Sequence, residues 1–158
     1  MSESIEIITL KGEVTIEIDY GDHKETRVIP NTVLLGGKGA VIASLANDIG
    51  GSFTNYIDRM VFGDGGEESG VPKQVKASYT TLFGQTRAQV SATPSRPPDV
   101  VNQVTFTSVL TTSHANGFTL NEAALQMGNG SLFSLVTFSG IPKTSTMTLT
   151  FNWSMTVV

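Results

Sequence analysis

The residues most suggestive of chemistry are a glycine-rich stretch with one lysine, Gly36-Gly37-Lys38-Gly39, ahead of an apolar segment. Glycine N–H groups and a lysine at the start of a helix can hold a phosphate group. The phosphate-binding motif, however, requires a glycine where Thr32 stands and a hydroxyl side chain where Gly39 stands. We therefore expect a flexible entry to a helix here and no nucleotide site.

Three acids, Asp64, Glu67 and Glu68, share a loop with four glycines, at positions 63, 65, 66 and 70. Calcium prefers several oxygen ligands on a flexible backbone, and these three acids could supply them. The spacing of the acids, however, is not that of a helix-loop-helix calcium site. We expect a solvated acidic loop that is mobile unless bound, and we expect no metal and no other cofactor.

Residues suited to nucleophilic catalysis are not arranged for it. His23 and His114 both lie among turn-forming residues, and Ser113 beside His114 has no identifiable orienting acid. No Gly-x-Ser-x-Gly motif occurs. The glycosylation pattern at Asn152-Trp153-Ser154 falls inside a predicted strand. We expect no catalytic residues and no enzyme activity.

The composition indicates which elements carry these residues. The chain has 158 residues, the size of one domain, with only 15% charged residues but 20 Thr and 15 Ser, which favours strands. A net charge of -4 gives no support for binding nucleic acid or an anionic membrane. From its first residues we expect no signal peptide, and the sequence contains no long apolar run and no cysteine. We expect a soluble protein without disulfides.

Alternating or compact apolar segments predict most of the chain as strands. The predicted strands cover residues 4–10, 13–20, 24–29, 56–62, 86–92, 101–110, 118–127, 132–138 and 146–157. We expect the first two strands to form a hairpin about Lys11-Gly12. Pro30 should end the third strand, because it has no N–H to donate. The strand over 56–62 is expected to be buried on both faces. Between glycine pairs at 36–37 and 50–51, one short helix is predicted from the spacing of Val41, Ile42, Leu45, Ala46 and Ile49.

These elements predict an all-β fold: one domain over residues 1–158, an antiparallel β-sandwich of jelly-roll type with one short helix. The face of Val14 and the face of Trp153 are expected to form the two halves of its core.

Charge is distributed unevenly along the chain, because Glu122 and Lys143 are the only charged residues between Val104 and Val158. Either Thr and Ser cover an exposed sheet face there, or another subunit covers that face. Glu122 is either a surface carboxylate or a partner of Lys143 that holds two strands or two subunits in register. Unchanged assembly and melting of Glu122→Gln would refute the pairing. The residues we expect at an interface are Glu122, Lys143, Thr148, Thr150 and Asn152.

Several short motifs are spread over the chain from residue 31 onward. They are Asn31-Thr32-Val33, Gly36 with the small helix, Tyr56-Ile57, Met60-Val61-Phe62-Gly63-Asp64-Gly65, Asn121-Glu122-Ala123-Ala124-Leu125, Leu132-Phe133-Ser134, Ile141-Pro142-Lys143-Thr144 and Leu149-Thr150-Phe151-Asn152-Trp153-Ser154-Met155. In this pattern the chain resembles small structural proteins of tailed bacteriophage virions. Similar successions of motifs occur in capsid decoration proteins and in tail or baseplate components.

The resemblance implies a virion structural protein, assembled in the host cytoplasm. Our leading interpretation is a capsid decoration (cement) protein, a homotrimer that bridges neighbouring subunits of the major capsid protein and contacts neither nucleic acid nor membrane directly. The alternative is a tail, baseplate or neck structural or adaptor protein. A carbohydrate-binding module or receptor-binding head is a third hypothesis, but such sites usually display aromatic platforms, and Trp153 lies in the core pattern.

Overall fold

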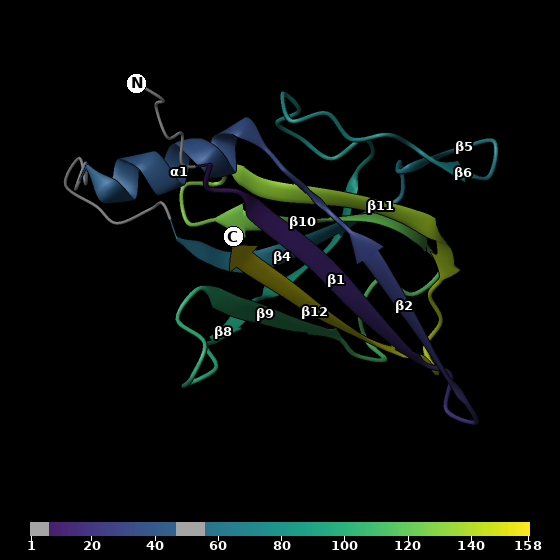
Figure 1. Ribbon diagram of the computed structural model, residues 1–158. Coiled ribbons are helices and arrows are strands. Elements are labelled where there is room, and N and C mark those ends of the chain that lie inside the picture. The colour runs from purple at the N-terminus through teal and green to yellow at the C-terminus, as the bar shows by residue number, and fades with distance from the viewer. Residues whose placement is uncertain (1–6, 47–55) are drawn as a thin grey trace, which may run out of the picture.

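The computed structural model describes residues 7–46 and 56–158, and two five-stranded antiparallel sheets form its body (Figure 1). The first sheet contains, in spatial order, β2 (Lys24–Pro30), β1 (Leu10–Asp19), β12 (Thr148–Val157), β9 (Gln103–Leu110) and β8 (Thr93–Ser95). The second contains β3 (Thr32–Val33), β11 (Leu132–Pro142), β10 (Thr119–Met127), β4 (Ile57–Gly63) and β7 (Thr86–Ser91). A β5 (Glu67–Glu68) and β6 (Val71–Pro72) hairpin and helix α1 (Leu35–Leu45) complete the described elements. The predicted antiparallel β-sandwich with one short helix is confirmed.

The core lies between the inner faces of the two sheets. Alternate residues of β1 and β12 are buried, as their sequence alternation predicts. Val14 and Trp153, however, are cross-strand partners on the same sheet, so the prediction that they belong to opposite halves of the core is wrong. The opposing half comes from the second sheet, where Met60, Phe62 and Leu125 are fully buried.

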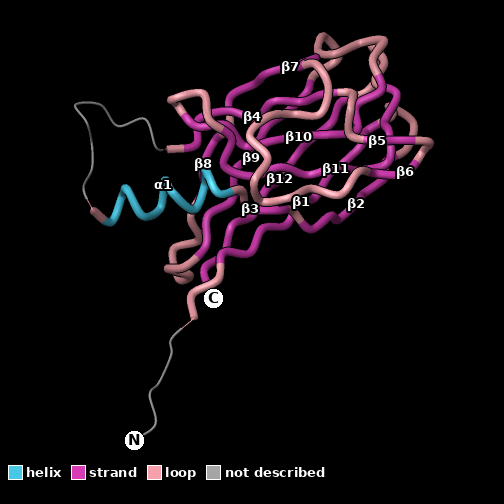
Figure 2. Tube along the Cα trace, turned by 90° about the horizontal axis from the view of Figure 1, so that it is seen from above, coloured by secondary structure: helices cyan, strands magenta, loops and turns pink. Residues whose placement is uncertain are grey.

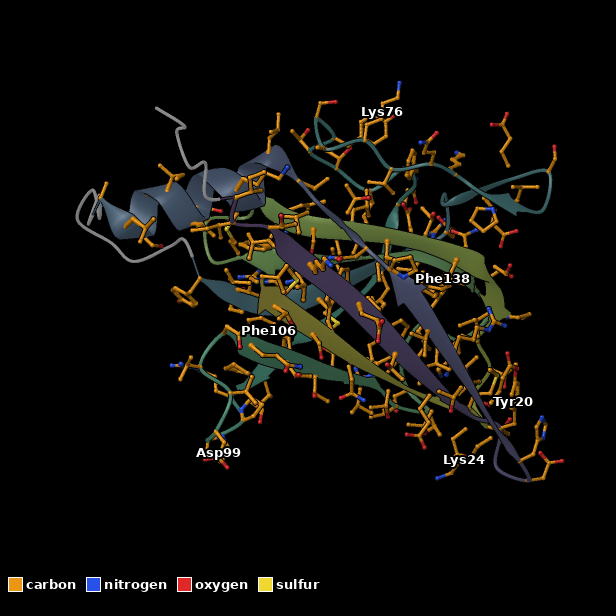
Figure 3. All side chains as sticks on the ribbon, viewed as in Figure 1. Tyr20, Lys24, Lys76, Asp99, Phe106 and Phe138 are labelled. Atoms are coloured by element: carbon orange, nitrogen blue, oxygen red, sulfur yellow. The ribbon has the colours of Figure 1, made fainter. Side chains whose placement is uncertain are left out.

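The low number of charged residues after residue 104 follows largely from the central places of these strands in their sheets. β12 is the central strand of the first sheet and β10 is the central strand of the second. The outer face of the second sheet is itself covered by the segment 73–84, whose Tyr79, Leu82 and Phe83 pack on β4, β10 and β11. Figure 3 shows Lys76 of this segment above the second sheet. Strands covered on both faces read as continuous apolar runs. The prediction of burial on both faces is confirmed for Met60, Val61 and Phe62, whereas Tyr56 is exposed and residues 57–59 are half-buried.

The predicted hairpin about Lys11-Gly12 is wrong, because β1 runs straight through these residues and pairs with β12 and β2. The side chain of Asn31 lies where a β-carbon on Gly12 would be. A glycine inside a strand can mark such a close approach as well as a turn. Residues 4–6 of the predicted first strand lie outside the described residues.

Helix α1 begins earlier than predicted, at Leu35, and includes the glycines expected to form a flexible entry. A β-carbon on Gly37 would meet the backbone oxygen and the ring of Phe133 on β11. The glycines therefore allow the helix to pack closely against the sheet. Ile49 and the glycine pair at 50–51 lie outside the described residues.

The two ends of the sandwich differ in chemistry. Helix α1 lies at one end, together with the C-terminus, and the β1–β2 turn and the β5–β6 hairpin lie at the other (Figures 1 and 2). Figure 3 places Tyr20 and Lys24 at the β1–β2 turn, where His23 stacks on Tyr20 with ring centroids 4.4 Å apart.

The edge strands of the first sheet, β2 and β8, contain Pro30 and Pro94. Proline has no N–H group to donate to a further strand, so these edges are poorly suited to pairing with another chain.

Candidate functional site

Glu122 on β10 is fully buried on the outer face of the second sheet, where it fixes two loops. Its Oε1 accepts hydrogen bonds from the backbone N–H groups of Gly65 and Gly84, at 3.0 and 2.8 Å. Its Oε2 accepts one from the backbone N–H of Phe83 at 2.7 Å. A carboxylate that accepts three N–H donors is well satisfied without a cationic partner. Glu122 therefore anchors the loop after β4 to the segment before β7.

The glycines around this carboxylate are required by close contact. A β-carbon on Gly65 would meet the backbone of Gly84, and one on Gly66 would meet the backbone of Asn121. The Gly66 N–H also donates to Oδ1 of Asn121 at 2.7 Å. The loop predicted to be mobile unless bound is thus bonded to β10 by two adjacent side chains. Asp64 pairs with Arg87 at 2.7 Å, which ties the same loop to β7.

Neither alternative for Glu122 holds, because its carboxylate is fully buried rather than on the surface and its partners are backbone N–H groups rather than Lys143. Within the described residues, Lys143 is 1% exposed and its Nζ donates to Oδ1 of Asn116 at 3.0 Å and to the backbone oxygen of Thr144 at 2.9 Å. The side chains of Glu122 and Lys143 are thus both buried, and each is hydrogen-bonded to nearby groups of its own chain. Another subunit could not contact either side chain unless the fold rearranged.

The burial of Lys143 gives a pH-dependence of stability. Desolvation lowers the pKa of its ammonium group, so the unfolded chain binds more protons between this lowered pKa and the ordinary value of about 10.4. Stability relative to Lys143→Met should therefore rise as the pH increases through that alkaline window, since the penalty for the buried charge fades. Chemical unfolding at a series of pH values measures the difference.

The matched control for this experiment is Lys76→Met, which removes one lysine from an exposed position. If both variants differ from the wild type by the same slope against pH, burial of Lys143 is not the cause of the slope.

Thr148, Thr150 and Asn152 lie on the outer face of β12, half-buried between β1 and β9. Oγ1 of Thr107 donates to Oδ1 of Asn152 at 2.8 Å, and the next pair along the strands joins the hydroxyls of Thr105 and Ser154 at 2.9 Å. The structure thus brings these three predicted residues together on one polar sheet face, apart from Glu122 and Lys143. Their role at an interface stays a prediction.

The most distinctive surface is one that the sequence interpretation missed. Helix α1 buries its small residues, Gly37 and Ala40, against the sandwich and turns large aliphatic side chains outward. Ile42 is 66% exposed and Leu45 is 80% exposed. A surface helix normally has the opposite arrangement. The signal was present in the sequence, because Gly37 and Ala40 are three residues apart on the face opposite the larger residues.

Further exposed aliphatic side chains come from α1, from the residues before β1 and from the chain end after β12, and several of them line two grooves. Figure 2 shows α1 and the C-terminus at the same end of the sandwich, which we call the α1 end. The α1 end comprises Ile7, Ile8, Leu35, Val41, Ile42, Leu45, Val101, Val157 and Val158. A groove of about 440 Å³ runs between α1 and the residues before β1, lined by Ile8, Thr9, Leu10, Lys38, Val41, Ile42 and Leu45. A second groove of about 380 Å³ shares Leu10 and continues toward Val101 and Val157.

Other kinds of site find little support among the described residues. Within 7–46 and 56–158, no group of three or more acidic or histidine side chains is placed to hold a metal ion. In the same part of the chain, no helix has the length and apolar character needed to cross a membrane. Comparison of the chain with protein-family models, with curated proteins and with solved structures finds no match.

Proposed function

We propose that this chain is a structural subunit that works by burying its α1 end against a partner in a larger assembly. The observation that carries this proposal is the outward-facing aliphatic surface of α1. Water-exposed apolar patches of this kind on folded domains usually mark binding surfaces. Complete burial of one Val, Ile or Leu side chain contributes about 1.5–3 kcal/mol, so a few such residues supply most of the energy of a stable contact.

The assembly we propose is the virion of a tailed bacteriophage, because the sequence motifs resemble virion structural proteins. A decoration protein acts by clamping neighbouring capsid subunits together, which requires adhesive surface rather than reactive groups. The two packed sheets and the segment 73–84, which Glu122 holds in place, suit such a role. A rigid subunit loses little conformational entropy when it binds. A position in the tail, baseplate or neck is the alternative within the same proposal.

Virions purified from a phage that encodes the chain provide the test. Particles made without the chain should bind added wild-type protein and carry it into the pellet on centrifugation. The double variant Ile42→Lys/Leu45→Lys should bind more than about 100-fold more weakly, because both substitutions place a charge in the apolar contact. A copy number close to that of the major capsid protein indicates the shell, and a much lower number indicates the tail.

The control is Val28→Lys, an aliphatic residue that is 59% exposed on the outer face of the first sheet. It should bind particles like the wild type. Equal binding by the α1 double variant would refute the proposed use of the α1 end, and no binding by the wild type would refute the proposed virion role.

A further inference from the structure

We propose that the groove beside α1 receives the β5–β6 hairpin of a second copy of this chain, so that copies join head to tail. The inference rests on the proposed function, because it names the partner that covers the α1 end.

The groove sets clear requirements for its occupant. Its walls are the aliphatic side chains of Ile8, Val41, Ile42 and Leu45, and Lys38 is the one charged residue among those that line it. An occupant that buries these walls must be apolar at its centre. It must also place a carboxylate near the ammonium group of Lys38, since an unpaired charge at the edge of an apolar contact weakens binding.

The β5–β6 hairpin meets both requirements. Val71 is 64% exposed, and it is the direct cross-strand partner of Glu68, so both side chains project from the same face of the hairpin. Glu67, the preceding residue on β5, projects from the opposite face of the hairpin, where its carboxylate lies against Gly140 of β11. The face that carries Val71 and Glu68 therefore combines one exposed aliphatic side chain with one carboxylate, which complements the groove and Lys38.

The hairpin is also held in shape before it binds. Ser69 and Gly70 both have positive φ, at 52° and 78°, as in the tight turns that match strand twist. The base of the hairpin is closed by a hydrogen bond from the Lys73 N–H to the Gly66 oxygen, at 2.7 Å. A preorganised loop loses less conformational entropy on binding than a mobile one.

The geometry requires two molecules. The groove and the hairpin lie at opposite ends of the sandwich (Figures 1 and 2), so a hairpin cannot reach the groove of its own chain. A contact between two different surface patches is heterologous, and its repetition produces a closed ring or an open chain. The homotrimer implied by the sequence resemblance would be a closed ring of this type.

A symmetric contact of α1 with α1 fits the charges less well. It would bring two Lys38 side chains into one interface, and no acid is among the residues that line the groove. Pairing of sheet edges is disfavoured at β2 and β8 by their prolines.

The test uses two full-length variants, Leu45→Lys in the groove and Val71→Lys in the hairpin, measured by sedimentation velocity over a range of concentrations. Wild-type protein should form larger species, and each variant alone should remain monomeric, with association about 30-fold weaker. An equimolar mixture of the two should form a 1:1 dimer, because it contains one intact groove and one intact hairpin. Val28→Lys, the control, should associate like the wild type.

A charge exchange tests the ionic part of the contact. Lys38→Glu and Glu68→Lys should each weaken association, and the double variant Lys38→Glu/Glu68→Lys should recover it. Association of Val71→Lys alone at wild-type strength, or a mixture of the two apolar variants that stays monomeric, would overturn the inference.

The outcomes also separate this inference from the proposed function. Wild-type protein that is monomeric at every concentration, yet binds phage particles through α1, overturns the inference and supports the proposed function. Wild-type protein that associates as described but does not bind particles supports the inference and refutes the virion role.

Discussion

Replacing Glu122 with alanine is expected to destabilise the fold by about 2–4 kcal/mol, because it removes the acceptor of three backbone N–H groups. For a domain of this size the loss corresponds to a melting temperature lowered by roughly 10 °C. Thermal unfolding followed by circular dichroism measures it. The amides of Gly65, Phe83 and Gly84 should exchange with solvent deuterium faster in the variant, since their hydrogen bonds end on this carboxylate.

Two further variants show whether the carboxylate itself is responsible. Glu122→Gln keeps one oxygen but turns an amide N–H₂ toward part of the donor set, so a smaller loss of about 1–2 kcal/mol is expected. Glu13→Ala removes an exposed acid from β1 and should change stability by less than about 0.5 kcal/mol. If Glu122→Ala melts like Glu13→Ala, the loops do not depend on this anchor.

Phe151→Ala is expected to cost about 3–5 kcal/mol, the usual range for removing a buried phenylalanine. Phe151 is fully buried on β12, and its ring contacts the rings of Phe62 and Phe138 on the opposite sheet, with centroid distances of 4.7 and 6.1 Å. The substitution leaves a cavity and removes both aromatic contacts between the sheets. Equilibrium unfolding in guanidinium chloride measures the change in free energy.

Phe118→Ala provides the comparison, because this ring is 38% exposed and lies under the guanidinium group of Arg87 rather than in the core. It should cost about 1 kcal/mol or less. Equal losses for the two variants would mean that the contact among the three rings does not join the sheets.

The sequence predicted the strands better than the surfaces. Alternation in β1 and β12 identified their buried residues, because a strand between core and solvent has a period of two residues. Glu122 was misjudged because a lone acid suggests a cationic partner, whereas its partners here are backbone N–H groups, which occur at every residue and carry no sequence signal. Loops distant in sequence, at 65 and 83–84, provide them.

Helix α1 shows a second limit of sequence patterns. The spacing of Val41, Ile42 and Leu45 indicates a helix with an apolar stripe, but spacing alone does not say whether the domain or a partner covers the stripe. The close approach of Gly37 to Phe133 decides the question, because it turns the small face toward the sheet and the large face away from it. The apolar stripe from which the helix was predicted is the surface on which the proposed function depends.

The most direct test of that function is whether the outward face of α1 becomes buried in the assembled state. The chain has no cysteine, so Ile42→Cys and Val28→Cys each accept one environment-sensitive fluorophore, at positions of similar exposure, 66% and 59%. On binding to particles or on self-association, the label at position 42 should shift its emission to the blue, while the label at position 28 should not change. A shift confined to position 28 would contradict the account and would place the interface on the polar face of Thr148, Thr150 and Asn152.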